Sequence, residues 1–330
     1  MAPERRSDCT SFPIEVTVVH EGRQWRNVSV TLIIASLASH QTFVDRDHPM
    51  TLPVRTIGNR HPLQLLFAVA VFAGPLGAQS PATPVDAIPA HDTFTVNSVA
   101  IGESRLINVY TPPGYRGSSA KKYPVLYMPD GGLDEDFPHV VNTVDSLIAL
   151  GVIRPVIVVG IPNTERRRDL TGPTRFATDS AIAKHVGGSA AFRRFIRDEL
   201  FPVVRARYRT TDERAIVGES LAGLFIVETF LAEPSLFSHY VALDPSLWWN
   251  GGAVVDSAET RLKTFNFAPR TLDMASSNVA DIAAGAARFA EIIRTVSPRG
   301  LAWVYFPRPD LTHGTIFRAV APSALARALR

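Results

Sequence analysis

The chain has 330 residues, of which 46% are hydrophobic and 20% are charged, and these proportions are typical of a globular protein with a sizeable core. The net charge is only +3 and the longest basic run is Arg166-Arg167-Arg168, so we expect no nucleic-acid partner. The single cysteine, Cys9, excludes a disulfide within the chain, a cysteine-based zinc site and a cysteine nucleophile in the body of the protein.

The N-terminal region has the pattern of a secretion signal. Residues 1–49 have no sustained helical or strand period, and a basic segment then precedes an apolar run from Leu63 to Gly77 in which Gln64 is the one polar residue. The run is too short for a membrane span and ends before a small residue, Ala78, as in a signal peptide. We therefore expect residues 50–78 to be a cleaved signal peptide and residues 1–49 to be a non-native extension. The mature chain is then periplasmic or secreted, without stable membrane insertion.

The remainder alternates short apolar runs with amphipathic segments. Residues 79–90 are rich in Pro and Ala and predict a linker. Strands are predicted at 93–99, 105–110, 123–128, 155–161, 215–217, 240–243, 271–275 and 301–306, with helices at 139–150, 192–204, 221–231 and 279–296. This alternation predicts one α/β domain over 91–330, with a mainly parallel sheet covered by helices on both faces.

One stretch, from Arg214 to Phe225, has the sequence of a strand, a sharp turn and a helix. The apolar strand ends at Gly218, Ser220 follows, and the small residues Ala222 and Gly223 open the helical pattern. A tight turn needs small residues on both sides of the serine, and it presents the serine oxygen at the positive end of the helix. The pattern resembles the nucleophile elbow of the α/β-hydrolases, with Ala222 in place of the second glycine.

The histidine that would activate Ser220 is His313. A serine hydroxyl needs a histidine to take its proton and an acid to hold that histidine. In α/β-hydrolases the acid and then the histidine follow the serine, on loops at the carboxyl ends of strands. His313 is the only histidine after the third-last predicted strand, and it follows the last one on a loop. His139, His185 and His239 are expected to be structural or exposed.

The acid is open between two carboxylates. Asp244 ends the strand after the elbow helix and is followed by Pro245, which fixes its backbone. Asp281 lies after the next strand, where this fold more usually keeps its acid, but about one turn into the following helix. The expected spot itself, residues 275–278, contains no carboxylate, so Asn278 or no acid at all is the third alternative. We expect Asp244 to be the acid, with Asp281 as the alternative.

The negative charge of an ester-hydrolysis intermediate needs two backbone N–H donors. One is expected at Leu221, directly after the nucleophile. The other is expected in the glycine turn after the strand at 123–128, at Gly132 or, next in order, at Gly131. Glycines there let the backbone approach a ligand closely, although a plain glycine turn is the alternative.

Several of these stretches together resemble the putative-esterase branch of the α/β-hydrolases, which contains enterochelin (ferric-siderophore) esterases and feruloyl-esterase-like enzymes. The matching segments are 123–131, 156–163, 166–171, 218–225, 244–250 and 313–314. The resemblance implies an α/β-hydrolase fold and a serine carboxylic-ester hydrolase with Ser220 and His313 as nucleophile and base. Many relatives have a Gly-x-Glu segment where this chain has Ser276-Ser277-Asn278. This departure favours Asp244, because an Asp-Pro at the preceding strand end serves as the acid in some lipases of this fold.

The expected partner is a small-molecule ester. Trp248 and Trp249 follow the Asp244 strand, where they would form an aromatic wall for an aryl or acyl group or else belong to the core. Arg168 in the arginine run would bind a carboxylate or catecholate, unless the run is a solvated charged face. Siderophore esters and aryl esters both fit these residues.

Two other functions are open on the same sequence. The first is transfer of the acyl group to an alcohol in place of water, as in the related mycolyltransferases. The second is a non-catalytic binding module on a hydrolase fold, which the absence of a carboxylate at Asn278 would favour. No motif predicts a cofactor or a metal ion, and the oligomeric state is open.

Overall fold

The computed structural model describes residues 86–117, 120–265 and 269–330. The expected N-terminal extension with Cys9, the expected signal peptide and the first part of the expected linker lie outside the described residues. No helix among the described residues is both long enough and apolar enough to cross a membrane.

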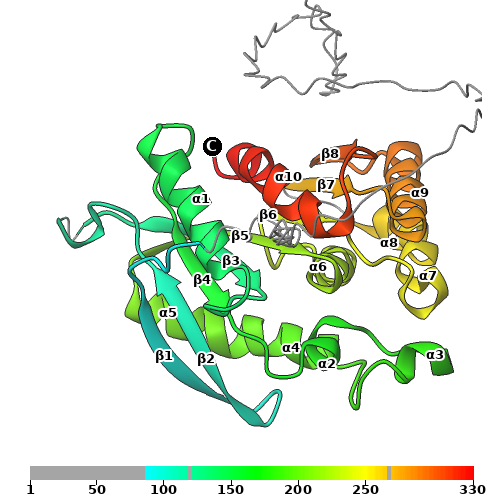
Figure 1. Ribbon diagram of the computed structural model, residues 1–330, viewed down its shortest axis with the longest axis horizontal. Helices are drawn as coiled ribbons and strands as arrows, with labels where there is room; N and C mark the ends of the chain where they lie inside the picture. Colours follow the sequence, from blue (N-terminus) through cyan, green and yellow to red (C-terminus); the bar gives the residue numbers. More distant parts are fainter. Residues whose placement is uncertain (1–85, 118–119, 266–268) are drawn as a thin grey trace, which may run out of the picture. The chain divides into compact units, whose positions relative to one another are not determined.

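Eight strands form one sheet in the order β1-β2-β4-β3-β5-β6-β7-β8 (Figure 1). The strands β1 and β2 pair as an antiparallel hairpin, β2 pairs antiparallel with β4, and all later pairs are parallel. Their bounds are β1 Asp92–Ser98, β2 Glu103–Tyr110, β3 Tyr123–Pro129, β4 Ile157–Ile161, β5 Thr210–Glu219, β6 His239–Leu243, β7 Arg270–Ser276 and β8 Leu301–Pro307. The mainly parallel sheet predicted from the alternating pattern is confirmed.

Helices cover both faces of this sheet. The helices are α1 Phe137–Ala149, α2 Arg166–Leu170, α3 Ala177–Ser180, α4 Ser189–Arg194, α5 Phe201–Arg207, α6 Leu221–Ala232, α7 Trp249–Asp256, α8 Ala258–Thr264, α9 Ala280–Val296 and α10 His313–Ala328. A π-helical segment, Phe195–Leu200, joins α4 to α5. The apolar side chains of α1 and α10 share one core cluster, whereas those of α4, α5, α6, α8 and α9 belong to another. Each face of the sheet therefore has its own buried layer.

The structure adds helices that the sequence pattern did not predict. The arginine run forms the short helix α2, and the chain from His313 onward forms α10. The helix α7 contains three consecutive residues with positive φ, Asn250, Gly251 and Gly252. The short helix α2 and the kinked helix α7 have no sustained apolar period, which is why periodicity does not reveal these two.

Three neighbouring strands are each followed directly by a residue with an unfavourable backbone conformation. Asp130 directly follows β3, Ser220 follows β5 and Asp244 follows β6, with φ values of 54°, 60° and 47°. The strands β3, β5 and β6 are adjacent in the sheet, so the three residues lie along one carboxyl edge. A positive φ is costly for residues other than glycine, and such strain concentrates at functional sites. The strained residues therefore indicate that the functional site lies at this edge of the sheet.

Candidate active site

The turn at Ser220 has a close-packed interior that explains the spacing of its small residues. Ser220 lies between β5 and α6 with φ 60° and ψ −118°. A Cβ atom on Gly218 would lie 2.6 Å from the methyl carbon of Ala222, so the methyl group at 222 is accommodated because 218 is glycine. A Cβ atom on Gly223 would lie 3.0 Å from the carbonyl oxygen of Leu243. The elbow predicted from the sequence is therefore formed, with Gly223 packing α6 against the end of β6.

Ser220, His313 and Asp244 form a continuous hydrogen-bonded row. His313 Nε2 lies 3.1 Å from Ser220 Oγ, and His313 Nδ1 lies 2.6 Å from Asp244 Oδ2. His313 is the first residue of α10 rather than a loop residue, because Thr312 and Thr315 form a capping box that begins the helix there. The row has the geometry in which an imidazole holds its Nδ1 proton on a carboxylate and accepts a serine proton at Nε2.

Asp244 is the carboxylate that contacts His313. It is 0% exposed, and its second oxygen accepts a hydrogen bond from the Ser277 N–H at 2.5 Å. Burial opposes ionisation of Asp244, but the hydrogen bonds from His313 and Ser277 outweigh it and lower the pKa of the carboxyl. Asp281 is exposed and accepts a hydrogen bond from the Ile282 N–H on its own helix. The structure therefore brings Asp244, and not Asp281, to His313.

Residues 275–278, which contain no carboxylate, still contribute to the contacts of Asp244. Ser277 supplies the backbone donor that orients Asp244, while Asn278 is exposed and its N–H donates to the Leu311 carbonyl oxygen. The Asp244 hydrogen bond raises the pKa of His313 against the opposing effect of burial, and the charge of Glu219 adds to the increase. An imidazole with a raised pKa is a stronger base, which suits proton abstraction from Ser220.

The backbone donors expected for an oxyanion differ in what they already bind. Leu221 is the first residue of α6, so its N–H has no acceptor within the helix. The prediction that Gly131 is an oxyanion donor is corrected, because its N–H already donates to the carbonyl oxygen of Ile161, at the end of β4, at 3.1 Å. Gly131 is required for packing, since a Cβ atom there would lie 2.2 Å from the Ile161 nitrogen. Leu221 and Gly132 remain the candidates.

Gly132 is held by an acidic side chain. Its N–H donates to Glu135 Oε2 at 2.7 Å, and the Glu135 N–H donates back to the Gly132 carbonyl oxygen. The other oxygen of Glu135 accepts from Asn163 Nδ2 at 2.7 Å. A carboxylate oxygen therefore occupies the acceptor position on the Gly132 N–H, and a substrate oxygen must replace it before Gly132 can stabilise negative charge.

The two tryptophans lie in different surroundings. Trp249 is 1% exposed and its Nε1 donates to the Gly172 carbonyl oxygen at 2.8 Å. The expected substrate-binding role of Trp249 is therefore corrected, because its ring and its polar atom are both used by the protein core. Trp248 is partly buried and packs against the same core cluster, so it retains some accessible surface.

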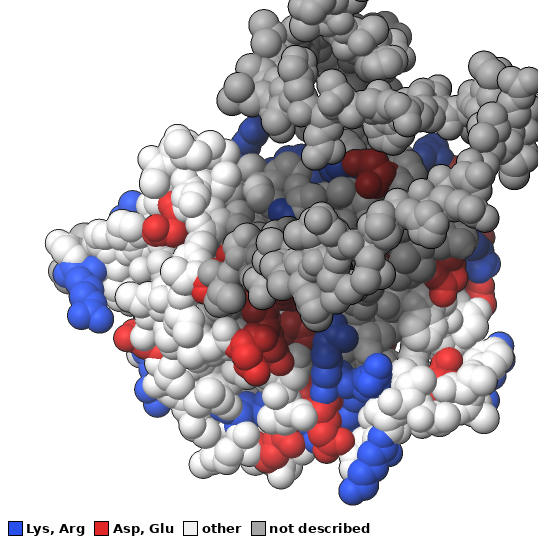
Figure 2. All heavy atoms as spheres, viewed as in Figure 1, with Lys and Arg blue, Asp and Glu red and all other residues white. Residues whose placement is uncertain are grey.

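The prediction that Arg168 binds a substrate anion is also corrected. The guanidinium of Arg168 binds Glu103, Glu165 and Asp169, so it has no donor group left over for a substrate anion. Arg166 instead donates two hydrogen bonds to the Asp130 carboxylate, at 2.7 and 2.8 Å, and its positive charge lowers the pKa of both His313 and Glu219. Figure 2 shows acidic and basic side chains lying next to one another on the visible part of this face, as expected for paired charges.

Two side chains near Ser220 have no role in the sequence-based hypothesis. Ser246 is 3% exposed, its N–H donates to the Ser220 carbonyl oxygen at 3.0 Å, and its Oγ lies 3.4 Å from Ser220 Oγ. Glu219, the residue before Ser220, lies 3.7 Å from His313 Nδ1. Ser246 belongs to the Pro-Ser-Leu-Trp-Trp segment and Glu219 to the elbow, so both lie in motifs that the sequence singled out.

The same residues include a group with the composition of a metal site. Ligand atoms of Glu219, Asp244 and His313 lie within 4.8 Å of one another. However, His313 Nδ1 donates its proton to Asp244 and Nε2 faces Ser220, so both imidazole nitrogens are engaged in a proton-transfer geometry. The arrangement of these groups fits proton transfer better than metal ligation.

Comparison with known proteins points in the same direction. The family model described as "Putative esterase" matches residues 98–278, which is more than half of the chain. The chain is 32% identical over 161 residues to the ferri-bacillibactin esterase BesA of Bacillus subtilis, an alignment that covers 42% of this chain and 52% of that protein. It is 29% identical over 196 residues to the siderophore triacetylfusarinine C esterase of Aspergillus fumigatus, covering 55% of this chain and 64% of the relative.

These alignments span about half to two thirds of the length of the curated relatives. Among solved structures, an IroE-like serine hydrolase from Shewanella oneidensis matches with a TM-score of 0.67 and 27% identity, covering 73% of this chain and 80% of that one. The siderophore hydrolase EstB from Aspergillus nidulans matches with a TM-score of 0.60 and 22% identity, covering 74% of this chain and 94% of that one, which shows the shared fold. The strained serine elbow, the eight-stranded sheet and the matched family model together show that this chain belongs to the esterase family of the α/β-hydrolase superfamily.

Proposed function

We propose that the protein is a serine ester hydrolase that acts through an acyl-enzyme on Ser220. The observation that carries this proposal is the row from Ser220 Oγ through His313 to buried Asp244, with distances of 3.1 and 2.6 Å. The family match supports the same reaction class, and the names of the relatives point to esters of siderophores.

The proposed reaction follows from the positions of these groups. Ser220 Oγ attacks the ester carbonyl carbon while its proton passes to His313 Nε2, and the C–O double bond becomes an oxyanion facing the Leu221 N–H. Gly132 adds a second donor once Glu135 has left it. Collapse of the intermediate breaks the ester C–O bond, and the departing alkoxide takes the proton from His313. Water then repeats the sequence on the acyl-enzyme and releases the carboxylic acid.

Substrate and location are further parts of the proposal. The relatives are named for ferri-bacillibactin and triacetylfusarinine C, and we propose a siderophore ester or a related aryl ester as the substrate. Trp248 is the aromatic candidate for contact with an acyl or aryl group. The basic and apolar pattern of residues 50–78 supports secretion, and N-terminal sequencing of the secreted protein should find Gln79 or a near neighbour.

The first experiment labels the full chain with a fluorophosphonate probe, beside Ser220→Ala. Labelling that is lost in Ser220→Ala, together with hydrolysis of p-nitrophenyl esters, is the expected result. A folded wild-type chain that takes up no label would overturn the serine mechanism. Product analysis with ferric and iron-free siderophore triesters, with and without an added alcohol, then separates hydrolysis from acyl transfer.

A further inference from the structure

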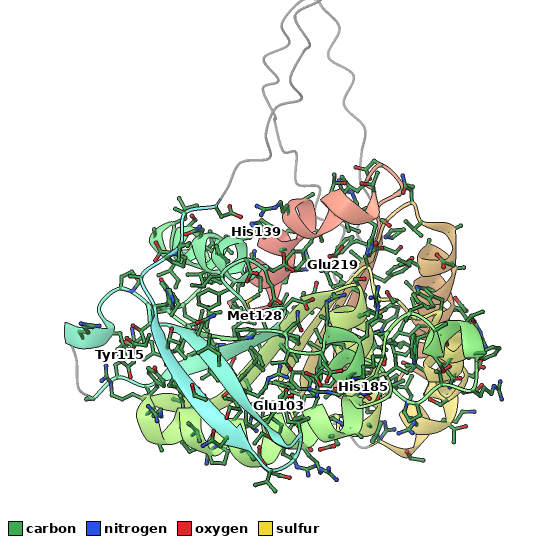
Figure 3. All side chains as sticks on the ribbon, turned by 60° about the horizontal axis from the view of Figure 1, so that its bottom comes forward. Glu103, Tyr115, Met128, His139, His185 and Glu219 are labelled. Carbon is green, nitrogen blue, oxygen red and sulfur yellow. The ribbon has the colours of Figure 1, made fainter. Side chains whose placement is uncertain are left out.

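A second carboxyl group faces the imidazole of the triad. Glu219, labelled in Figure 3, ends β5. Its side chain is only 18% exposed. Its Oε1 atom is buried and has no hydrogen-bond partner among the described residues, yet it lies 3.7 Å from His313 Nδ1. A buried polar atom without a partner is costly, and such atoms in native proteins call for an explanation.

Hydrogen bonding does not explain this placement. The single proton on His313 Nδ1 is directed at Asp244, 2.6 Å away, so Glu219 cannot also accept it at ordinary geometry. What remains is the charge of Glu219. A negative charge at this distance favours a positive imidazolium, which is the form that His313 takes while it holds the Ser220 proton.

The surroundings allow that charge to respond to pH. The charged groups that act on Glu219 are Asp136 at the start of α1, Arg166 on α2, Asp244 after β6 and His313 on α10, and atoms of Asp244 and His313 lie within 4.8 Å of it. Burial raises the pKa of Glu219 to about 7, Asp136 and Asp244 add to the increase, and His313 and Arg166 oppose it. Glu219 and His313 each favour the charged form of the other, because their charges are opposite in sign.

We propose that Glu219 is a positioning residue for catalysis, which acts by stabilising the imidazolium form of His313 through its negative charge. This inference rests on the proposed function, because it assigns Glu219 a role in the same proton transfer. Glu219 does not touch the substrate in this proposal, and its effect passes entirely through His313.

The test is the pH profile of Glu219→Gln, which keeps the shape of the side chain and removes its charge. His313 must be neutral to accept a proton, so the acid limb of kcat/KM follows its pKa. Without the nearby negative charge that pKa falls, and the limb should move to lower pH by about one unit, the lower end of the effect of a close charge. The plateau kcat should fall about tenfold, because one pKa unit is a tenfold change in proton affinity.

Matched variants separate charge from structure. Glu219→Asp keeps the charge and should give a profile nearer to wild type than Glu219→Gln. Asp273→Asn is the control, because Asp273 is also buried and binds Arg327 at the far end of the helix that begins with His313. Its acid limb should coincide with that of wild type. A Glu219→Gln limb that stays in place, or moves to higher pH, would overturn the inference.

Two readouts keep this inference distinct from the proposed function. If Ser220→Ala labels like wild type, the serine mechanism itself fails. If Ser220→Ala loses labelling while Glu219→Gln keeps the wild-type profile, only the role of Glu219 fails. A nuclear magnetic resonance titration of the His313 ring in the Ser220→Ala background measures its pKa without turnover, and adding Glu219→Gln should lower that pKa.

Discussion

Replacing Asp244 by Asn tests the arrangement of the triad most directly. Asp244 Oδ1 accepts from the Ser277 N–H at 2.5 Å and Oδ2 accepts from His313 Nδ1 at 2.6 Å. In Asp244→Asn one oxygen becomes an NH₂ group, and the Ser277 N–H holds the remaining oxygen. The NH₂ group then faces His313 Nδ1, which must become an acceptor. The imidazole proton moves to Nε2, where it blocks acceptance of the Ser220 proton.

The expected loss in kcat is about 10⁴-fold, the effect of the wrong histidine tautomer in a serine triad. This corresponds to about 5 kcal/mol of lost transition-state stabilisation. The assay is steady-state hydrolysis of a p-nitrophenyl ester, with the fluorophosphonate labelling rate as a second measurement. The fold is retained because the side chain keeps its shape, which thermal unfolding checks.

Asp281→Asn is the matched control for this prediction. Asp281 is exposed on α9, and within the described part of the chain its carboxylate binds only the neighbouring Ile282 N–H. Its kcat should stay within about twofold of wild type, as for a surface substitution away from special features. A loss below tenfold in Asp244→Asn, or a loss above a hundredfold in Asp281→Asn, would refute the assignment of Asp244.

Three further outcomes follow from the same geometry. Glu135→Ala frees the Gly132 N–H, so the fluorophosphonate labelling rate should rise; an unchanged rate would mean that Gly132 is not an oxyanion donor. Trp249→Ala should lower the free energy of unfolding in urea by about 3–5 kcal/mol, because it empties a fully buried site; a change below 1 kcal/mol would contradict its core position. Because the folded-state pKa of Glu219 is raised, the unfolded chain loses that proton first, and stability falls as pH rises from 4.5 to about 7. Glu219→Gln should therefore be more stable than wild type at pH 8, by up to about 3 kcal/mol, and equal stability at pH 8 would contradict the buried charge.

The positions of the strands and of the turn at Ser220 could be predicted from local pattern. Buried parallel strands are continuous apolar runs, and runs such as Tyr123–Pro129 and Ile157–Ile161 stand out for that reason. The elbow is also set mainly by local contacts. Gly218, Ala222 and Gly223 must be small because they pack closely against one another near Ser220 and against the end of β6. His313 was predicted from chain order, although its place at the start of α10 was not.

The side chains around the triad were less accessible to sequence reasoning. Asp244 and Asp281 are both carboxylates near strand ends, and only the register of β6 and β7 decides that the Ser277 N–H and His313 meet Asp244. Trp248 and Trp249 are neighbours in sequence, but only Trp249 has its ring nitrogen against the Gly172 carbonyl oxygen. Residue type does not separate the members of either pair. Chain position favoured Asp244 over Asp281, but only the contacts in the folded protein decide between them.

The sequence by itself therefore determined the sheet-and-helix class, the serine elbow and the histidine that follows the last strand, because these depend on local sterics and on hydrophobic period. The tertiary structure alone decided between Asp244 and Asp281 as the partner of His313, paired Arg166 with Asp130 and showed which backbone N–H groups are already engaged. It also revealed the buried Glu219 oxygen beside His313. These features depend on distances between residues far apart in the chain, which are set only when the sheet and both helical layers have packed.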